Sequence, residues 1–233
     1  MVRRWFALVP LVAAMLAGCG ASGSAQADSV VRLPEPRLDP APAQPGEQVA
    51  VFAGGCFWGV EAVFDHVRGV RKAWAGYAGG SADTASYDRV SDGDTGHAES
   101  VKVLYDPRQV SYGQLLKVFF SVALDPTQLD RQGPDVGSQY RSVVFYATPQ
   151  QQQVAKAYIS QLAVAHAFDA PIVTQVAPLR GFYVAEAYHQ NYAALHPDNP
   201  YIVYNDAPKV VHLKQWLPAL YRPQTQVVEV QLH

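Results

Sequence analysis

The residue with the clearest chemical potential is Cys56, which follows two glycines and precedes two aromatic residues in the run Gly54-Gly55-Cys56-Phe57-Trp58. A cysteine acts as a nucleophile only as the thiolate, and the first turn of a helix favours that anion. A lone cysteine is also often a small buried core residue, so position alone leaves both interpretations open. Two adjacent aromatics point in different directions, so at least one should line a pocket suited to a small, weakly polar group.

The elements around Cys56 follow from the apolar pattern of the chain. Residues 48–53 form a short apolar run that ends at two glycines, which is typical of a buried strand followed by a tight turn. A helix is predicted directly afterwards, and its apolar residues share one face: Val60, Val63, Phe64 and Val67. We therefore expect Cys56 at a strand-to-helix turn.

Strands and helices alternate along the rest of the chain. Strands are predicted over residues 70–77, 101–105, 142–147 and 172–177, and helices after Ser111, over 149–165 and over 186–195. Two polar stretches, 81–96 and 125–139, are predicted as loops. The pattern indicates one α/β or α+β domain over residues 48–205. The tail, 206–233, is expected to pack on it through Val210, Leu213 and Leu217.

The composition excludes some classes of function. The 233 residues carry a formal net charge of −2, with 49% hydrophobic and 16% charged residues. Such a chain can bury one sizeable core, so we expect a single catalytic domain that works as a monomer. There is no basic field of the kind that binds phosphate backbones, which argues against nucleic acid as a partner.

The amino end is predicted to direct export. Two arginines precede an apolar run at 5–17, which is too short to span a membrane comfortably and is typical of a signal peptide, residues 1–18. The run ends in Leu16-Ala17-Gly18-Cys19, which resembles the bacterial lipobox. We expect Cys19 to be lipidated and the protein to be a membrane-anchored lipoprotein that faces the periplasm or cell envelope. An ordinary cleaved signal with an incidental cysteine is the alternative.

Residues 19–47 are rich in Ala, Ser, Pro and Gly and show no apolar periodicity. This composition predicts an extended tether between anchor and domain. If Cys19 is lipidated, Cys56 is left as a single thiol, and a disulfide scaffold is excluded.

A series of ordered blocks resembles peptide methionine sulfoxide reductase A, a family that reduces the S epimer of methionine sulfoxide. The first is Gly54-Gly55-Cys56-Phe57-Trp58-Gly59. The others are Gly76-Tyr77-Ala78-Gly79-Gly80, Thr95-Gly96-His97-Ala98-Glu99, Tyr105-Asp106-Pro107, Asp125-Pro126-Thr127, Arg131-Gln132-Gly133, Asp135, Gln139-Tyr140-Arg141-Ser142 and Tyr188-His189-Gln190. The resemblance spans about residues 49–201 and implies an α/β, plait-like fold in which a mixed sheet flanked by helices surrounds a βαβ core.

The resemblance also implies roles for the catalytic groups. Cys56 would attack the sulfoxide sulfur and end as a sulfenic acid. Glu99 matches the proton donor, which needs a raised pKa, and the alternative for it is an exposed carboxylate before a strand. Tyr87 and Tyr140 match phenols that donate hydrogen bonds to the sulfoxide oxygen, although either could serve packing alone.

Three further residues match the substrate pocket. Phe57 and Trp58 correspond to the wall that holds the methyl group, and Asp135 corresponds to a polar residue of the same pocket. Capping of a loop is the competing explanation for Asp135. His97 and His189 lie in matched blocks without an assigned chemical step, and no zinc site is predicted, because the ligands for one are lacking.

The chain also departs from the family pattern. Many relatives carry a cysteine at the position of Ser91 and a histidine at that of Leu124, and neither change is expected to be chemical. Residues 202–233 contain no recycling cysteine. We therefore expect no cofactor and an external thiol reductant, either a thioredoxin-like protein or a small thiol, acting on an enzyme whose substrates are oxidised proteins or peptides.

Two other functions fit a single reactive cysteine. A thiol peroxidase would also cycle through a sulfenic acid, but a peroxide has no need of an aromatic wall. A surface-anchored lipoprotein that binds methionine-like ligands without turnover is the alternative outside enzymology. The two are distinguished by peroxide turnover and by ligand binding with an inert thiol.

Overall fold

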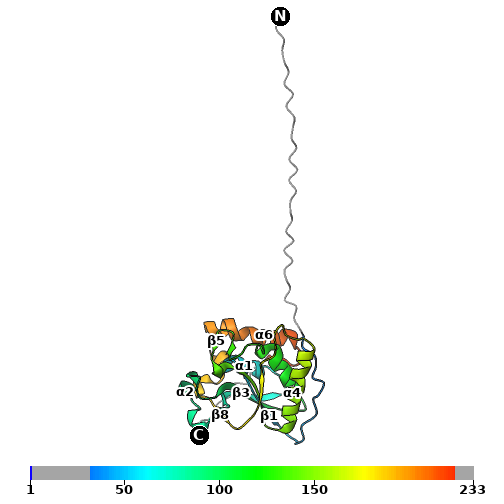
Figure 1. The fold of residues 1–233 in the computed structure, drawn as a ribbon, viewed down its shortest axis with the longest axis vertical. Helices are drawn as coiled ribbons and strands as arrows, with labels where there is room; N and C mark the ends of the chain where they lie inside the picture. The colour runs from blue at the N-terminus through cyan, green and yellow to red at the C-terminus, as the bar shows by residue number, and fades with distance from the viewer. Residues whose placement is uncertain (2–31, 224–233) are drawn as a thin grey trace. The chain divides into compact units, whose positions relative to one another are not determined.

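The folded part of the protein is built on a six-stranded sheet (Figure 1). The computed structural model describes Met1 and residues 32–223. The strands are β1 (Gln48–Gly54), β2 (Val70–Ala78), β3 (Ala98–Tyr105), β6 (Ser142–Tyr146), β7 (Gln175–Pro178) and β8 (Phe182–Val184), in the order β7-β6-β1-β3-β2-β8. Neighbours pair antiparallel except β6 and β7, which are parallel, so the sheet is mixed.

The major helices cover one face of this sheet (Figure 1). They are α1 (Phe57–Asp65), α3 (Tyr112–Val118) and α4 (Pro149–Val164). The path β1-α1-β2-β3-α3-β6, with β3 between β1 and β2, is a split βαβ plait. The predicted mixed sheet flanked by helices is confirmed.

The strand side chains alternate between two cores. In β1, Ala50 and Phe52 join the large core under the helices, whereas Val51 and Ala53 join a smaller cluster on the opposite face. In β3, Val101 and Val103 are fully buried in the large core. This period of two is the pattern that sequence analysis expected for a pleated strand.

The two polar stretches contain short elements of their own. Residues 81–96 form η1 (Ala82–Thr84) and α2 (Tyr87–Ser91). Residues 125–139 contain β4 (Arg131–Gln132), β5 (Asp135–Val136) and the start of η3 (Ser138–Tyr140). Short elements of this kind fix side chains more firmly than an irregular loop of the same length would.

The single helix expected over 186–195 is divided into two pieces. A 3₁₀ turn, η4 (Ala187–His189), precedes the short α5 (Tyr192–Leu195). Between them Asn191 adopts a left-handed conformation with φ 55°, which interrupts helical hydrogen bonding. Two π-helical turns, η2 (Phe119–Ala123) and η5 (Ile202–Asp206), complete the fold, and η5 leads into α6 (Ala207–Trp216).

Side chains cap the starts of two of the major helices. Ser111 caps α3 in a full capping box with Gln114. At α4 the Thr148 side chain accepts from the Gln151 N–H, but the Gln151 side chain accepts from the Ala147 N–H instead of returning to Thr148. The box at α4 is therefore only half formed.

Residues 32–47, predicted as part of an extended tether, pack on the domain instead. Leu33 is buried, and the Pro34 carbonyl accepts a hydrogen bond of 2.9 Å from the Tyr158 hydroxyl. The Asp39 carboxylate accepts from the Gly113 N–H at the start of α3. One apolar side chain and a few polar contacts are enough to order a proline-rich segment, whose unfolded entropy is already low. The folded unit therefore begins before residue 48.

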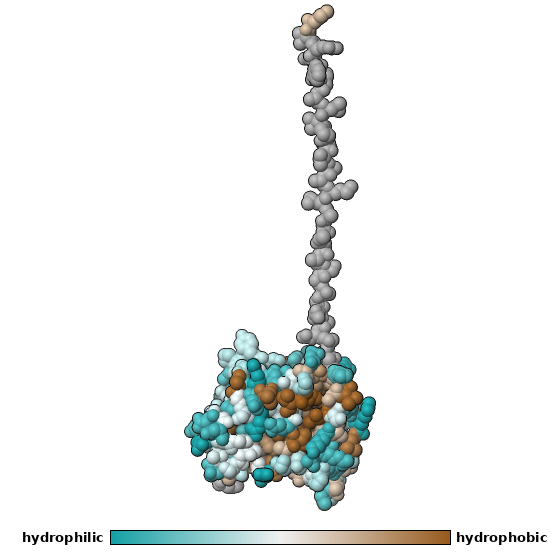
Figure 2. Space-filling view, in the orientation of Figure 1, coloured by the Kyte–Doolittle hydropathy of each residue, from teal (hydrophilic) through white to brown (hydrophobic). Residues whose placement is uncertain are grey.

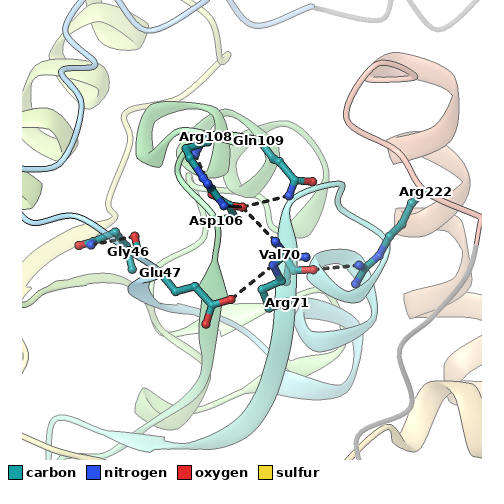
Figure 3. A network of polar contacts seen from close by, with 9 residues as sticks. Gly46, Glu47, Val70, Arg71, Asp106, Arg108, Gln109 and Arg222 are labelled. Atoms are coloured by element: carbon teal, nitrogen blue, oxygen red, sulfur yellow. Dashed lines mark hydrogen bonds and ion pairs between the residues drawn. The ribbon is translucent and has the colours of Figure 1, made fainter.

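An acidic residue just after β3, Asp106, forms hydrogen bonds with the surrounding arginines (Figure 3). The Asp106 carboxylate accepts hydrogen bonds from Arg71, Arg108 and Gln109 at 2.8–3.1 Å. Hydrogen bonds from Arg108 are the main cause that holds the Asp106 pKa well below its usual range. Arg71 also pairs with Glu47 at 3.4 Å. The network joins β2, β3 and the residues just before β1.

The described part of the tail also packs on the domain. Leu213 of α6 is fully buried, and Val210 and Leu217 lie against the large core. Arg222 donates hydrogen bonds of 2.8 Å to the carbonyls of Asp65 and Val70, the second of which is drawn in Figure 3. The chain thus returns to the end of α1 after leaving α6.

On the face seen in Figure 1, apolar surface gathers near the middle with hydrophilic side chains around it (Figure 2). Within residues 32–223, no helix combines the length and apolar character needed to cross a bilayer. Apart from Met1, the predicted signal peptide lies outside the described residues, as do Cys19 and residues 20–31 and 224–233.

The packing of residues 32–47 predicts that Leu33→Ala lowers the free energy of unfolding by about 2–4 kcal/mol, because it removes a buried side chain and leaves a cavity. Chemical denaturation of residues 32–233 with and without the substitution measures this. Gln44→Ala, an exposed position in the same segment, is the matched control. An effect of Leu33→Ala no larger than that of the control would show that the segment is a spacer after all.

Candidate active site

A tight turn of backbone presents Cys56 at the start of α1. Gly55 has φ +88°, and a Cβ there would lie 2.4 Å from the Cβ of Gln132, so only glycine fits. Cys56 occupies the N-cap of α1 and is 8% exposed. The predicted strand-to-helix position is confirmed, and the thiol is almost closed off from solvent.

A carboxyl group from the middle of the sheet meets this turn. Glu99, on β3, accepts a hydrogen bond of 3.0 Å at Oε2 from the backbone N–H of Phe57, the residue after Cys56. Its side chain is buried. The Glu99 pKa is raised to about 8, mainly by burial; the Phe57 N–H opposes this rise, and Asp135 and Asp206 add to it. Glu99 is therefore protonated at neutral pH and is not the exposed carboxylate of the alternative interpretation.

The Cys56 thiol is held in its protonated form. Burial is the largest effect and raises its pKa well above the ordinary value, and the carboxyls of Glu99 and Asp206 add to it. The Trp58 backbone N–H and the Lys209 ammonium act in the opposite direction. The thiolate expected at a helix start is therefore disfavoured at rest, because desolvation outweighs the free N–H groups of the first turn.

The two aromatic residues after Cys56 diverge as predicted. Phe57 is fully buried, with its ring 4.9 Å from that of His189. Trp58 is partly buried and stacks on Tyr192 at 3.8 Å. The Trp58 Nε1–H donates to Nδ1 of His189 at 3.1 Å, so the His189 proton lies on Nε2. Burial lowers the His189 pKa, which keeps this ring neutral and able to hold the indole in place.

Two phenols lie within electrostatic reach of the same groups. Tyr87 begins α2 and Tyr140 ends η3, and both side chains are partly buried. Burial is the main cause that raises both pKa values, and Glu99 and Cys56 also raise them. Each phenol is therefore a neutral hydrogen-bond donor within electrostatic reach of the carboxyl and the thiol.

A cavity of about 220 Å³ opens beside Cys56. Asp135 and Tyr201 line it, and the Tyr201 hydroxyl donates a hydrogen bond to the Asp135 carboxylate. Of the residues predicted from the sequence to be catalytic or substrate-binding, Cys56 and Asp135 lie in this lining, whereas five lie outside it: Phe57, Trp58, Tyr87, Glu99 and Tyr140. Asp135 thus lines the same cavity as Cys56.

The two positions that depart from the family pattern, and the matched residue His97, have plain structural roles. The Ser91 hydroxyl donates to the Tyr87 carbonyl at 2.7 Å, within α2. Leu124 contributes an apolar wall to the Cys56 cavity. His97 is buried, with hydrogen-bond contacts to the Gly80 N–H and the Ser81 carbonyl, so it holds the turn after β2.

Sequence reasoning missed four residues of the site. Tyr201 and Lys209 line the cavity, Asp206 acts on the Cys56 thiol, and His189 orients Trp58. The only available signal was that Tyr201 and His189 fall in the matched region, because nothing in the spacing relates residues so far along the chain to Cys56. No cluster of three potential metal ligands occurs among the residues that the structure describes.

Comparison with known proteins gives a consistent result. The profile of the family described as peptide methionine sulfoxide reductase matches residues 48–219. Peptide methionine sulfoxide reductase MsrA 2 of Mesorhizobium japonicum is 56% identical over 186 residues, which cover 80% of this chain and 95% of that protein.

Two solved structures are similar. Methionine sulfoxide reductase A of Corynebacterium diphtheriae is 37% identical, with a TM-score of 0.57 and coverage of 67% of this chain and 78% of that one. Mxr1 from Saccharomyces cerevisiae in its reduced form is 33% identical, with a TM-score of 0.59 and coverage of 66% and 87%.

The raised pKa of Glu99 predicts a pH-dependent cost to stability. The folded protein holds this proton up to about pH 8, whereas an unfolded glutamate releases it near pH 4.3. The contribution of Glu99 to the free energy of unfolding is therefore fully present below about pH 4.3 and is lost as the pH rises toward 8. Glu99→Gln cannot titrate. Between pH 4.5 and 8.5, its free energy of unfolding should therefore rise by about 2–4 kcal/mol relative to that of the parent.

Urea denaturation of both proteins at the two pH values measures the difference. Asp169→Asn, at an exposed position, is the control and should follow the parent. A constant difference between Glu99→Gln and the parent across this range would contradict a raised Glu99 pKa.

Proposed function

The chain belongs to the peptide methionine sulfoxide reductase family, and from that premise we propose that it reduces the S epimer of methionine sulfoxide with Cys56 as the nucleophile. The substrates are oxidised proteins and peptides, and free methionine sulfoxide as well. The high identity over most of a curated relative supports the reaction class. The geometry around Cys56 supports the assignment of roles.

In the proposed first step, Glu99 donates its proton to the sulfoxide oxygen and accepts the proton of the Cys56 thiol. The cysteine sulfur attacks the sulfoxide sulfur and forms a transient S–S bond. The hydroxyl then passes from the methionine sulfur to the cysteine sulfur, the S–O bond to methionine and the S–S bond break, and Cys56 is left as a sulfenic acid while methionine departs. The methionine sulfur gains the two electrons that the cysteine sulfur loses. Glu99 begins and ends the step in the protonated form.

The observation that carries this mechanism is the protonated carboxyl beside the thiol. Glu99 is buried, has a pKa of about 8 and is hydrogen-bonded to the residue after Cys56. A general acid works best when its pKa lies near the working pH. A neutral acid also lets a neutral sulfoxide bind without burying a charge.

The other side chains serve binding in this proposal. The neutral phenols of Tyr87 and Tyr140 donate hydrogen bonds to the sulfoxide oxygen and stabilise the charge that develops there. Phe57 and Trp58 form the wall against the methyl group, and Asp135 is a polar residue of the same pocket. The support for this arrangement is the electrostatic proximity of both phenols to Glu99 and the fixed orientation of the Trp58 indole.

Regeneration is proposed to use an external thiol without a bound cofactor. A first thiol attacks the sulfenic acid, releases water and forms a mixed disulfide with Cys56, and a second thiol displaces the enzyme. The thiol is a thioredoxin-like protein or a small molecule. The support is that Cys19 and Cys56 are the two cysteines of this chain.

We also propose that the protein works outside the cytoplasm as a lipoprotein. The signal at 1–18 and the lipobox-like sequence at Cys19 support export and anchoring in the cell envelope. In that place the enzyme would repair exported proteins that have been oxidised. Labelling with a radioactive fatty acid, with Cys19→Ala as the control, tests the anchor.

Turnover of the separate S and R epimers of a methionine sulfoxide peptide tests the main proposal. We expect the S epimer alone to be reduced, with dithiothreitol as reductant, and Cys56→Ser to lose turnover entirely, because an alcohol cannot replace the thiolate. If neither epimer is reduced by a protein whose thiol is shown to be free, the reductase mechanism is wrong. Faster turnover of a peroxide would then favour the thiol peroxidase.

The external recycling route makes a separate prediction. Without added thiol, the enzyme should release about one methionine per molecule, because its cycle stops at the sulfenic acid. Mass spectrometry of the full chain after this single turnover should place the oxidation on Cys56. A Cys19–Cys56 disulfide would contradict the external route.

A further inference from the structure

The carboxyl-terminal segment places an ion pair against the first turn of α1. A Cβ at Gly59, three residues after Cys56, would lie 2.0 Å from Oδ1 of Asp206 and 2.8 Å from Nζ of Lys209. Only a glycine leaves space for this approach. The two charged residues therefore reach the backbone of the turn that carries the thiol.

The pair is well formed and unevenly exposed. Lys209 Nζ lies 3.1 Å from Asp206 Oδ1, and the side chains are 22% and 0% exposed. Lys209 lines the same cavity as Cys56. Its ammonium group is thus partly solvated and close to the thiol, whereas Asp206 is closed off from water.

The charges that face Cys56 come from several elements. Glu99 on β3 and Asp206 disfavour the thiolate, and the phenols that interact with the thiol are Tyr87, Tyr140 and Tyr201. Asp135 on β5 lies in the same cavity. Among the described residues that act on the thiol, Lys209 is the one cation. Its positive charge therefore favours the thiolate in a site whose acidic groups disfavour it.

We propose that Lys209 is a positioning residue that sets how much of Cys56 is present as thiolate, and that Asp206 limits its effect through the ion pair between them. The inference rests on the proposed role of Cys56 as the nucleophile. The S–H bond breaks, the proton leaves to solvent, and the sulfur anion remains opposite the ammonium group. No electron transfer is involved in this step.

The size of the effect follows from distance and solvation. An opposite charge within about 4–6 Å shifts a titration by about 1–3 units. Lys209 is partly solvated and already paired, so the low end of that range applies. Removal of the cation should then reduce the thiolate fraction about tenfold near pH 7.5.

The pH dependence of Cys56 alkylation by iodoacetamide, with the site assigned by mass spectrometry, tests the proposal. For Lys209→Met we expect a midpoint about one pH unit higher and about tenfold slower alkylation at pH 7.5. Lys209→Arg should stay close to the parent, because it keeps the charge. Asp206→Asn should move the midpoint the other way.

Lys214→Met is the matched control, because it removes the same charge from an exposed position on the same helix. It should leave the midpoint unchanged. If Lys209 had a purely structural role, Lys209→Met and Asp206→Asn would shift the alkylation midpoint in the same direction, and that result would overturn the proposal. An unchanged midpoint in Lys209→Met would also overturn it. If Asp206→Asn does not fold, the comparison of Lys209→Met with Lys209→Arg decides the matter.

Alkylation does not depend on which substrate the enzyme reduces. A shifted midpoint in a protein that reduces no sulfoxide would contradict the proposed function and leave the role of Lys209 intact. An unshifted midpoint in an active reductase would contradict the role of Lys209 alone.

Discussion

The site depends on one buried hydrogen bond, from the backbone N–H of Phe57 to the carboxyl of Glu99. It joins the first turn of α1 to the middle of the sheet and brings an acid beside Cys56. The bond satisfies an N–H that no helical carbonyl could reach. It also places a carboxyl where water is excluded, and this exclusion keeps both the acid and the thiol protonated. Protonation of both groups is thus a result of packing.

Strand register determines which groups can meet. Tyr77 on β2 pairs with Glu99 on β3, and β3 also pairs with β1, which leads directly into the Cys56 turn. A shift of one residue would turn the Glu99 side chain to the opposite face of the sheet. The split βαβ arrangement therefore positions the acid as well as the core. Around it, His189 and Tyr192 fix the orientation of the Trp58 indole.

Both ends of the described chain contribute to the domain. Residues 32–47 bind α3 and α4 through Leu33, Pro34 and Asp39. At the other end, η5 and α6 bring Asp206 and Lys209 to the thiol. Both segments are ordered by contacts with the rest of the domain. The Cys56 environment is therefore completed by residues about 150 positions away in the chain.

The sequence by itself determined the elements and the identity of the main chemical groups. Apolar periodicity placed β1 and α1, and motif blocks selected Cys56 and Glu99. Such features are local, since a helix face or a glycine turn depends on neighbouring residues. The tertiary structure alone decided the ionisation of Cys56, the packing of residues 32–47, and the approach of Asp206 and Lys209. Burial and contact between distant segments set these properties, and no local pattern of residues records them.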